Sequence, residues 1–106
     1  MIKLSDRLNI ELKEVISLRR EIKAIRVNTS INATTENIYR VLLANDEEQS
    51  INLVKARIEA GVSYFYINQR NEAINLEMSC PIYKEHSIRS NNYDGVYDSI
   101  MDLPHF

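Results

Sequence analysis

Apolar residues recur at helical spacing between Thr34 and Gly61, and this pattern predicts two short helices. Thr34 is a candidate N-cap, because a threonine hydroxyl accepts a hydrogen bond from an unpaired N–H of the first turn. The apolar stripe behind it consists of Ile38, Val41 and Leu42. The second helix begins at Asp46 and has its apolar stripe at Ile51, Val54 and Ile58. Gly61 follows where a left-handed residue ends a helix.

After Gly61 the spacing of apolar residues changes from the helical period to a period of two. Residues 62–67 are rich in β-branched and aromatic side chains, and residues 68–72 are a polar break of hairpin length. Strict alternation then follows at Ile74, Leu76, Met78 and Cys80. Pro81 ends the run because it has no N–H to donate. The pattern therefore predicts two antiparallel strands joined by a loop.

The N-terminal third is expected to begin with a long amphipathic helix, from Ser5 or Asp6 to about Ala24. Its apolar side packs either on the chain's own hairpin or on a second subunit. In the second case the dimer interface consists of Leu8, Val15, Leu18 and Ile22. Residues 25–33 alternate as a strand does, so their assignment to strand or helix stays open.

The C-terminal segment differs in composition from the preceding chain. Residues 85–92 are polar and predict a loop, and Asp94 with Gly95 predicts a turn. Val96, Tyr97, Ile100 and Leu103 lie at the spacing of one short helical face. We therefore expect a compact domain over residues 1–80, with residues 81–106 as a loop and short helix packed on it or on a partner.

Together these elements predict an α+β fold with a long N-terminal helix, two short helices, a small antiparallel sheet built on a hairpin, and a short C-terminal helix or tail. The order over residues 5–80 is helix, strand, helix, helix, strand, loop, strand, which resembles a winged helix. That resemblance rests on element order alone. It implies that the third helix contacts DNA and that the hairpin forms the wing.

The composition is that of an ordinary globular domain, with 44% hydrophobic and 26% charged residues in a chain of 106. The net charge is −2, but residues 1–27 carry seven Lys and Arg against four Asp and Glu, or +3. The remainder carries −5, and such a division favours contacts with partners. The sequence has neither an apolar run long enough to span a membrane nor an apolar N-terminal signal core, so we expect a cytoplasmic protein.

The chain lacks the usual catalytic and cofactor motifs. Gly61 and Gly95 are 34 residues apart, so they build no phosphate-binding loop. Cys80 lies on the apolar side of a predicted strand, where a buried inert thiol is expected. With His86 and His105 it does not form a metal-binding pattern. We therefore expect a non-enzymatic protein without cofactor or metal.

Six tyrosines are the other prominent feature, and they suggest protein binding. In the strand over residues 62–67, Tyr64 and Tyr66 share one side, which is covered by a partner or by the chain's own elements. The expected partner-binding residues are Tyr64, Tyr66, Tyr93, Tyr97 and Asp98. We expect a small inhibitor or regulator of the kind carried by phages and mobile elements.

The alternative is a winged-helix transcriptional regulator that binds DNA and dimerises through its first helix. Its DNA-contacting residues would be Lys55, Arg57 and Arg70. The acidic run at residues 46–48 opposes this, since DNA affinity depends largely on phosphate neutralisation. Binding of a small nucleotide stays open.

Overall fold

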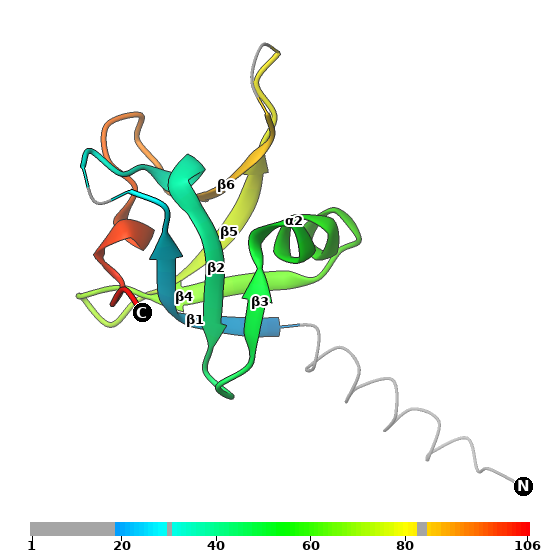
Figure 1. Cartoon of the computed structure of the whole chain (residues 1–106), viewed down its shortest axis with the longest axis vertical. Coiled ribbons are helices and arrows are strands. Elements are labelled where there is room, and N and C mark those ends of the chain that lie inside the picture. The colour runs from blue at the N-terminus through cyan, green and yellow to red at the C-terminus, as the bar shows by residue number, and fades with distance from the viewer. Residues whose placement is uncertain (1–18, 30, 83–84) are drawn as a thin grey trace, which may run out of the picture.

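The computed structural model describes residues 19–29, 31–82 and 85–106, which form one curled sheet with a single α-helix among them (Figure 1). The strands are β1 (Arg19–Val27), β2 (Ile38–Leu43), β3 (Glu48–Ser50), β4 (Ser63–Ile67), β5 (Ala73–Ser79) and β6 (Ser87–Ser90). The helices are α2 (Ile51–Glu59) and the short 3-10 turns η1 (Thr35–Asn37) and η2 (Ser99–Asp102).

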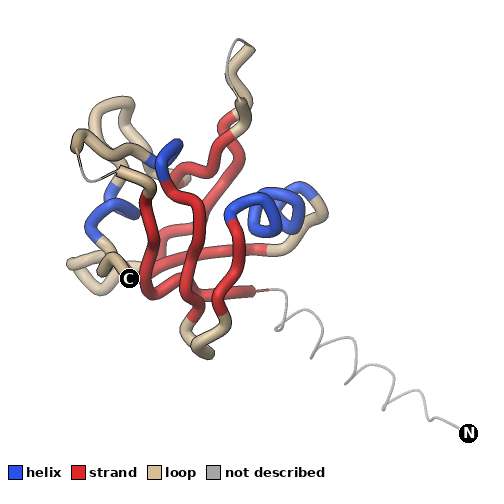
Figure 2. Tube along the Cα trace, in the orientation of Figure 1, coloured by secondary structure: helices blue, strands red, loops and turns tan. Residues whose placement is uncertain are grey.

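The six strands lie in the order β3-β2-β1-β4-β5-β6. Each half is an antiparallel meander, and the two halves join where β1 runs parallel to β4. Two strands change neighbours along their length: β1 pairs with β4 and then with β2, and β5 pairs with β4 and then with β6. The sheet therefore curls, so that α2 packs on β2, β3 and β5, while η1 lies against β6 (Figure 2).

The prediction of a helix up to Ala24 is wrong over the described residues, because Arg19–Val27 is a strand. Its register shifts between Ile22 and Ala24, so that Ile22 and Ile25 both enter the core although they are three residues apart. Such a bulge places one extra residue in a strand. Because of this bulge, the apolar residues of β1 have the same spacing in sequence as those of a helix.

The first short helix is also wrong, because β2 occupies most of the predicted range. A second register shift, between Arg26 and Val27 of β1, brings Ile38 and Val41 onto the same core-facing side. Asp46 is not a helix cap. It has a positive φ of 68° in the turn between β2 and β3, where its N–H donates to the carbonyl of Leu43 at 2.9 Å.

The second short helix is confirmed as α2, with a later start than predicted. Ser50 is its N-cap, and the Ser50 hydroxyl accepts from the N–H of Leu53 at 3.3 Å. Gly61 has a φ of 98°, as expected of a left-handed residue that follows a helix. The N–H of Gly61 donates to Ile58, and the N–H of Val62 donates to Arg57. These two bonds form a Schellman motif, which commonly ends a helix at a left-handed glycine.

The hairpin after Gly61 is confirmed as β4 and β5, with the polar loop between them. The Asn68 side chain closes this loop by accepting from the N–H groups of Arg70 and Glu72. Residues 85–92 are not a loop throughout, because β6 lies within them and extends the sheet beside β5. Cys80 is exposed and follows the end of β5, so the expectation of a buried thiol is wrong.

The core lies inside the curl of the sheet and is closed by the C-terminal residues. Its buried members include Ile22, Ile25, Ile38, Val41, Leu43, Val54, Tyr64, Tyr66, Ile74, Leu76, Ile88 and Ile100. The chain end pairs with β1: the N–H of Ile25 donates to Pro104, and that of Phe106 donates to Ile25. The Arg26 guanidinium lies over the Phe106 ring at 4.3 Å, which adds a cation–π contact to this closure.

The expected winged-helix-like α+β fold is therefore wrong for the part of the chain that the structure describes. Two predicted helical segments are strands, and the sheet has six strands, whereas a small sheet built on one hairpin was predicted. The helix implied to read DNA is present as α2, but the hairpin implied to form a wing is not a projecting element, since β4 and β5 are interior strands of the sheet.

We predict that Val54→Ala lowers the free energy of unfolding by about 2 kcal/mol, because Val54 is the fully buried residue of α2 and its loss leaves a cavity. Leu53→Ala is the matched control, since Leu53 is on the same helix but 40% exposed. It should cost less than about 1 kcal/mol. Urea unfolding at unchanged m-value measures both, and equal losses would contradict this packing.

Candidate functional site

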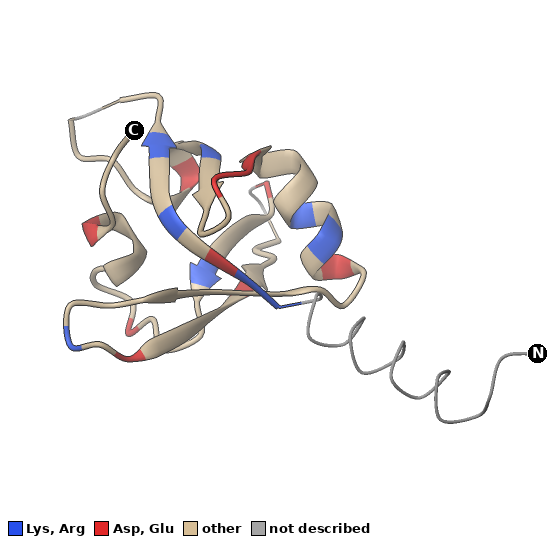
Figure 3. Cartoon of the chain, turned by 90° about the horizontal axis from the view of Figure 1, so that it is seen from below, with Lys and Arg blue, Asp and Glu red and all other residues tan. Residues whose placement is uncertain are grey.

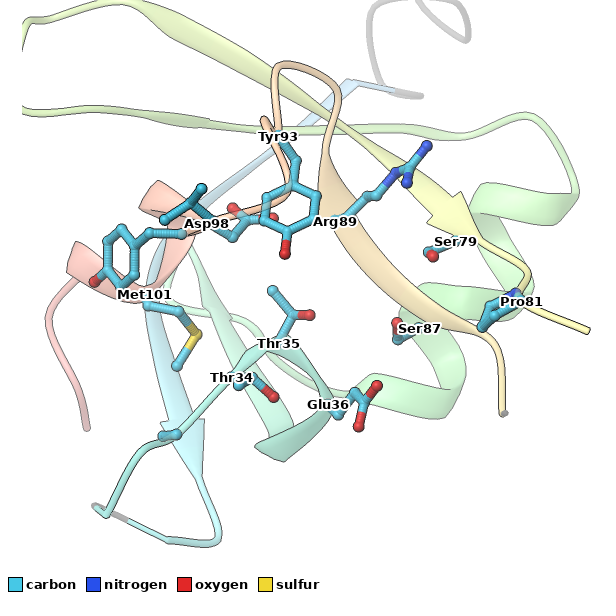
Figure 4. Close-up of a pocket in the computed structure, with 13 residues that line it drawn as sticks. Thr34, Thr35, Glu36, Ser79, Pro81, Ser87, Arg89, Tyr93, Asp98 and Met101 are labelled. Atoms are coloured by element: carbon cyan, nitrogen blue, oxygen red, sulfur yellow. The ribbon is translucent and has the colours of Figure 1, made fainter. Parts of the chain in front are cut away.

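A groove of about 470 Å³ opens between three connections of the curled sheet, and we call it the loop groove. It is lined by Ala33, Thr34, Thr35, Glu36, Ser79, Pro81, Ser87, Arg89, Tyr93, Val96, Tyr97, Asp98 and Met101. Its walls come from η1, the β5–β6 hairpin, and the segment between β6 and η2 (Figure 4). A volume of this size lies within the usual range of ligand pockets.

Asp98 lies at the base of the groove, and neutral donors hold its carboxylate. Its side chain accepts from the N–H of Ser90 at 2.8 Å, from the N–H of Ile100 at 3.1 Å, and from the hydroxyl of Ser90. Asp98 is 6% exposed, and none of the ion pairs in the described part of the chain involves it. The groove therefore has a buried negative charge without a cationic partner among these residues.

The donor and the acceptor of each hydrogen bond beneath the groove can be assigned. The single hydroxyl proton of Ser90 goes to Asp98, so the Tyr66 hydroxyl must donate to the Ser90 oxygen, 2.5 Å away. Ser99, also 2.5 Å from the Tyr66 oxygen, then donates to Tyr66. Burial raises the pKa of Tyr66, which keeps the phenol protonated for this donation. This buried network joins β4, β6 and η2.

Two exposed tyrosines line the groove. Tyr93 points into the space between the loops and faces Thr35 of η1 (Figure 4). The hydroxyl of Tyr97 donates to Asp102 at 2.7 Å. That hydrogen bond to a carboxylate is the main cause that raises the pKa of Tyr97 to about 12. Both rings remain accessible at the surface.

The opposite walls are also fixed by hydrogen bonds. Arg89 of β6 donates through Nε to Glu77 of β5 at 2.9 Å, so its charge is matched by its cross-strand neighbour. At η1, the Asn37 side chain accepts from the N–H of Thr34 at 2.9 Å and donates to Asn28 at 3.1 Å. These contacts hold the hydroxyl-bearing residues Thr34 and Thr35 at the groove.

Each of the three connections around the groove exposes a large apolar side chain. Ile31 is 77% exposed between β1 and η1, Ile82 is 89% exposed between β5 and β6, and Val96 is 86% exposed between β6 and η2. Of these three residues Val96 lines the groove, whereas Ile31 and Ile82 do not, and single exposed apolar residues of that kind are common on any protein.

Tyr64 and Tyr66 do not lie at this surface, which corrects the expectation that they contact a partner. Both are fully buried, and the chain's own elements cover their side of β4. The Tyr64 hydroxyl donates to Gln49 of β3 at 2.7 Å, and Tyr66 belongs to the network described above. Of the five expected partner-binding residues, the structure brings Tyr93, Tyr97 and Asp98 together at the loop groove.

The expected dimer interface cannot be assembled from the described chain. Leu8, Val15 and Leu18 lie outside the described residues. Ile22 is a fully buried core residue of β1, so it does not contact a second subunit. Its apolar character is explained by the core.

The residues expected to contact DNA are dispersed. Lys55 and Arg57 are on α2, whereas Arg70 is in the β4–β5 turn, and Figure 1 shows these elements at opposite ends of the sheet. The basic residues of β1 are interrupted by one acidic residue, Glu21 (Figure 3). Lys23 pairs with Asp46, and Arg26 and Arg40 both pair with Glu48. Phosphate binding would have to compete with these carboxylates.

No three or more His, Cys, Asp or Glu side chains in residues 19–29, 31–82 and 85–106 are placed to hold a metal ion. No helix within the same ranges is long and apolar enough to cross a membrane.

We predict that Tyr97 remains protonated at pH 11 in the native chain and that Asp102→Asn allows it to ionise near the usual pKa of about 10. The folded pKa is raised, so the stabilisation from this contact is present below about pH 10 and lost as the pH rises through about 12. Ultraviolet absorbance of ionised phenol, compared with a Tyr97→Phe variant, measures the difference. Ionisation of native Tyr97 near pH 10 would show that the contact with Asp102 is absent in solution.

Sequence reasoning found one wall of the groove and missed the other two. Tyr93, Tyr97 and Asp98 are close in sequence, whereas Thr34 and Thr35 reach the same site only because the curl of the sheet brings η1 against β6. The alternation over Ser87–Ser90 is too short to have predicted β6.

Comparison of the chain with known proteins finds no matching family model, no similar curated protein and no similar solved structure.

Proposed function

We propose that this chain is a non-catalytic binding protein that holds a segment of another protein in the loop groove and acts on that partner as an inhibitor or regulator. The observation that carries the proposal is one concave site of about 470 Å³ that Tyr93, Val96 and Tyr97 line together with residues of η1 and the β5–β6 hairpin. Binding residues are frequently located on loops that a rigid scaffold positions.

The residue types at the groove support a protein partner. Tyr93, Tyr97, Met101 and Arg89 line it, and aromatic residues, Met and Arg are enriched in protein interfaces. Tyrosine contributes a large contact area while its hydroxyl remains able to hydrogen-bond. The serine and threonine hydroxyls on the other walls add donors and acceptors for the backbone of a bound segment.

A rigid base supports the same proposal. The network from Asp98 through Ser90 to Tyr66 fastens the segment between β6 and η2 to the sheet. A groove with a fixed base loses less conformational entropy when a ligand binds.

We predict that short peptides selected on the wild-type chain from a random displayed library lose at least tenfold in affinity with Tyr93→Ala and with Val96→Asp. The first change removes a ring from the groove, and the second places a charge at an apolar tip. Fluorescence anisotropy of the synthetic peptides measures the dissociation constants.

Leu53→Asp is the matched control, because Leu53 is an exposed apolar residue on α2 and does not line the groove. It should leave the affinities within about twofold. Unchanged circular dichroism and thermal midpoints would show that the groove variants are folded. A selection that yields only peptides insensitive to both groove variants would refute the proposed site.

A further inference from the structure

We infer that the segment held in the loop groove is cationic, with a Lys or Arg side chain directed to the base of the groove near Asp98. This inference rests on the proposed function and adds the chemistry of the partner. It follows from the distribution of charge on the groove walls, from the aromatic and apolar groups beside that charge, and from the way the single lining arginine is already paired.

The segment that carries the tyrosines is uniformly acidic. Residues 91–106 contain Asp94, Asp98 and Asp102 and neither Lys nor Arg. Asp94 is exposed beside the apolar tip, where its side chain accepts from the N–H of Val96 at 2.9 Å. A partner with positive charge would be attracted to this wall, whereas an acidic partner would be repelled.

Asp98 gives that attraction a specific location. Its carboxylate is buried at the groove, and the donors that hold it are two backbone N–H groups and one hydroxyl. Neutral donors stabilise the negative charge but do not cancel it, so a cation that enters the groove gains from a partly desolvated attraction. The two carboxylate oxygens together accept three bonds, which leaves capacity for a further donor.

The other side chains near Asp98 suit the remainder of a long basic residue. Tyr93 and Tyr97 present aromatic rings, whose faces attract ammonium and guanidinium groups. Met101 and Val96 offer apolar surface on which the methylene stem of Lys or Arg can lie. A short acidic side chain would meet the same apolar surface without the favourable charge.

Arg89 does not reverse this preference. It is the one arginine among the described lining residues, and its Nε donates to Glu77 at 2.9 Å. A carboxylate from a partner would have to displace or share this cross-strand contact. An ammonium or guanidinium from a partner can approach Asp98 while that pair stays intact.

Three capped pentapeptides provide the test: acetyl-Lys-Leu-Lys-Leu-Lys-amide and its counterparts with Gln or Glu in place of Lys. Each is titrated into the full-length, isotopically labelled chain, and backbone amide shifts report the site and the affinity. The Lys peptide should shift amides of residues 34–36 and 93–98 and should bind at least tenfold more tightly than the Gln peptide. The Glu peptide should bind more weakly than both.

Variants then identify the responsible carboxylates. Asp98→Asn should reduce the preference for Lys over Gln at least threefold, and Asp94→Asn should reduce it by a smaller factor. Asn at position 94 can still accept the bond from Val96, so this exposed change tests charge even if Asp98→Asn proves unstable. Glu72→Gln, in the β4–β5 turn outside the groove, should leave the preference unchanged.

The outcomes separate this inference from the function on which it rests. If the Gln or Glu peptide shifts the groove amides as strongly as the Lys peptide does, the cationic preference is wrong and the groove remains a peptide site. If none of the three peptides shifts the groove amides, or if the Lys peptide shifts only other amides, both proposals are refuted.

Discussion

The position of the candidate site depends on one buried chain of hydrogen bonds, from Ser99 through Tyr66 and Ser90 to Asp98. A buried carboxylate is costly unless donors surround it, and here the same donors belong to the elements that must be joined. Removing the Ser90 hydroxyl would leave both Tyr66 and Asp98 without their shared partner. The segment between β6 and η2 is consequently bound to the sheet at the point where the loop groove begins.

Charge on the rest of the described molecule is arranged differently. On β1 and β2, Lys23, Arg26 and Arg40 pair with carboxylates of the β2–β3 region, and Arg89 pairs with Glu77 across β5 and β6. Exposed pairs of this kind contribute little to stability. Their effect here is to reduce the positive potential of the sheet surface. The acidic segment after β6 has no such compensation within its own sequence, so its negative charge is not balanced locally.

The central helix and the hairpin were predicted correctly because the sequence pattern of each is typical of one kind of secondary structure only. Gly61 occupies the left-handed position that commonly follows a helix, and the alternation from Ile74 onward has no helical equivalent. The strands β1 and β2 were mistaken for helices for a physical reason. Register shifts within this strand pair place Ile22 with Ile25, and Ile38 with Val41, on the core side at a spacing of three residues. Local periodicity does not distinguish that spacing from a helical turn.

The same limitation explains which part of the site was accessible from sequence. Tyr93, Tyr97 and Asp98 occupy one short segment, so local composition was sufficient to associate them. Thr35 joins them only because the curl of the sheet brings η1 against β6. That curl depends on β1 and β5 each pairing with two different neighbours along their length. Because these pairings connect residues far apart in the chain, the groove is a product of the tertiary fold, and its three walls are held by separate sets of bonds.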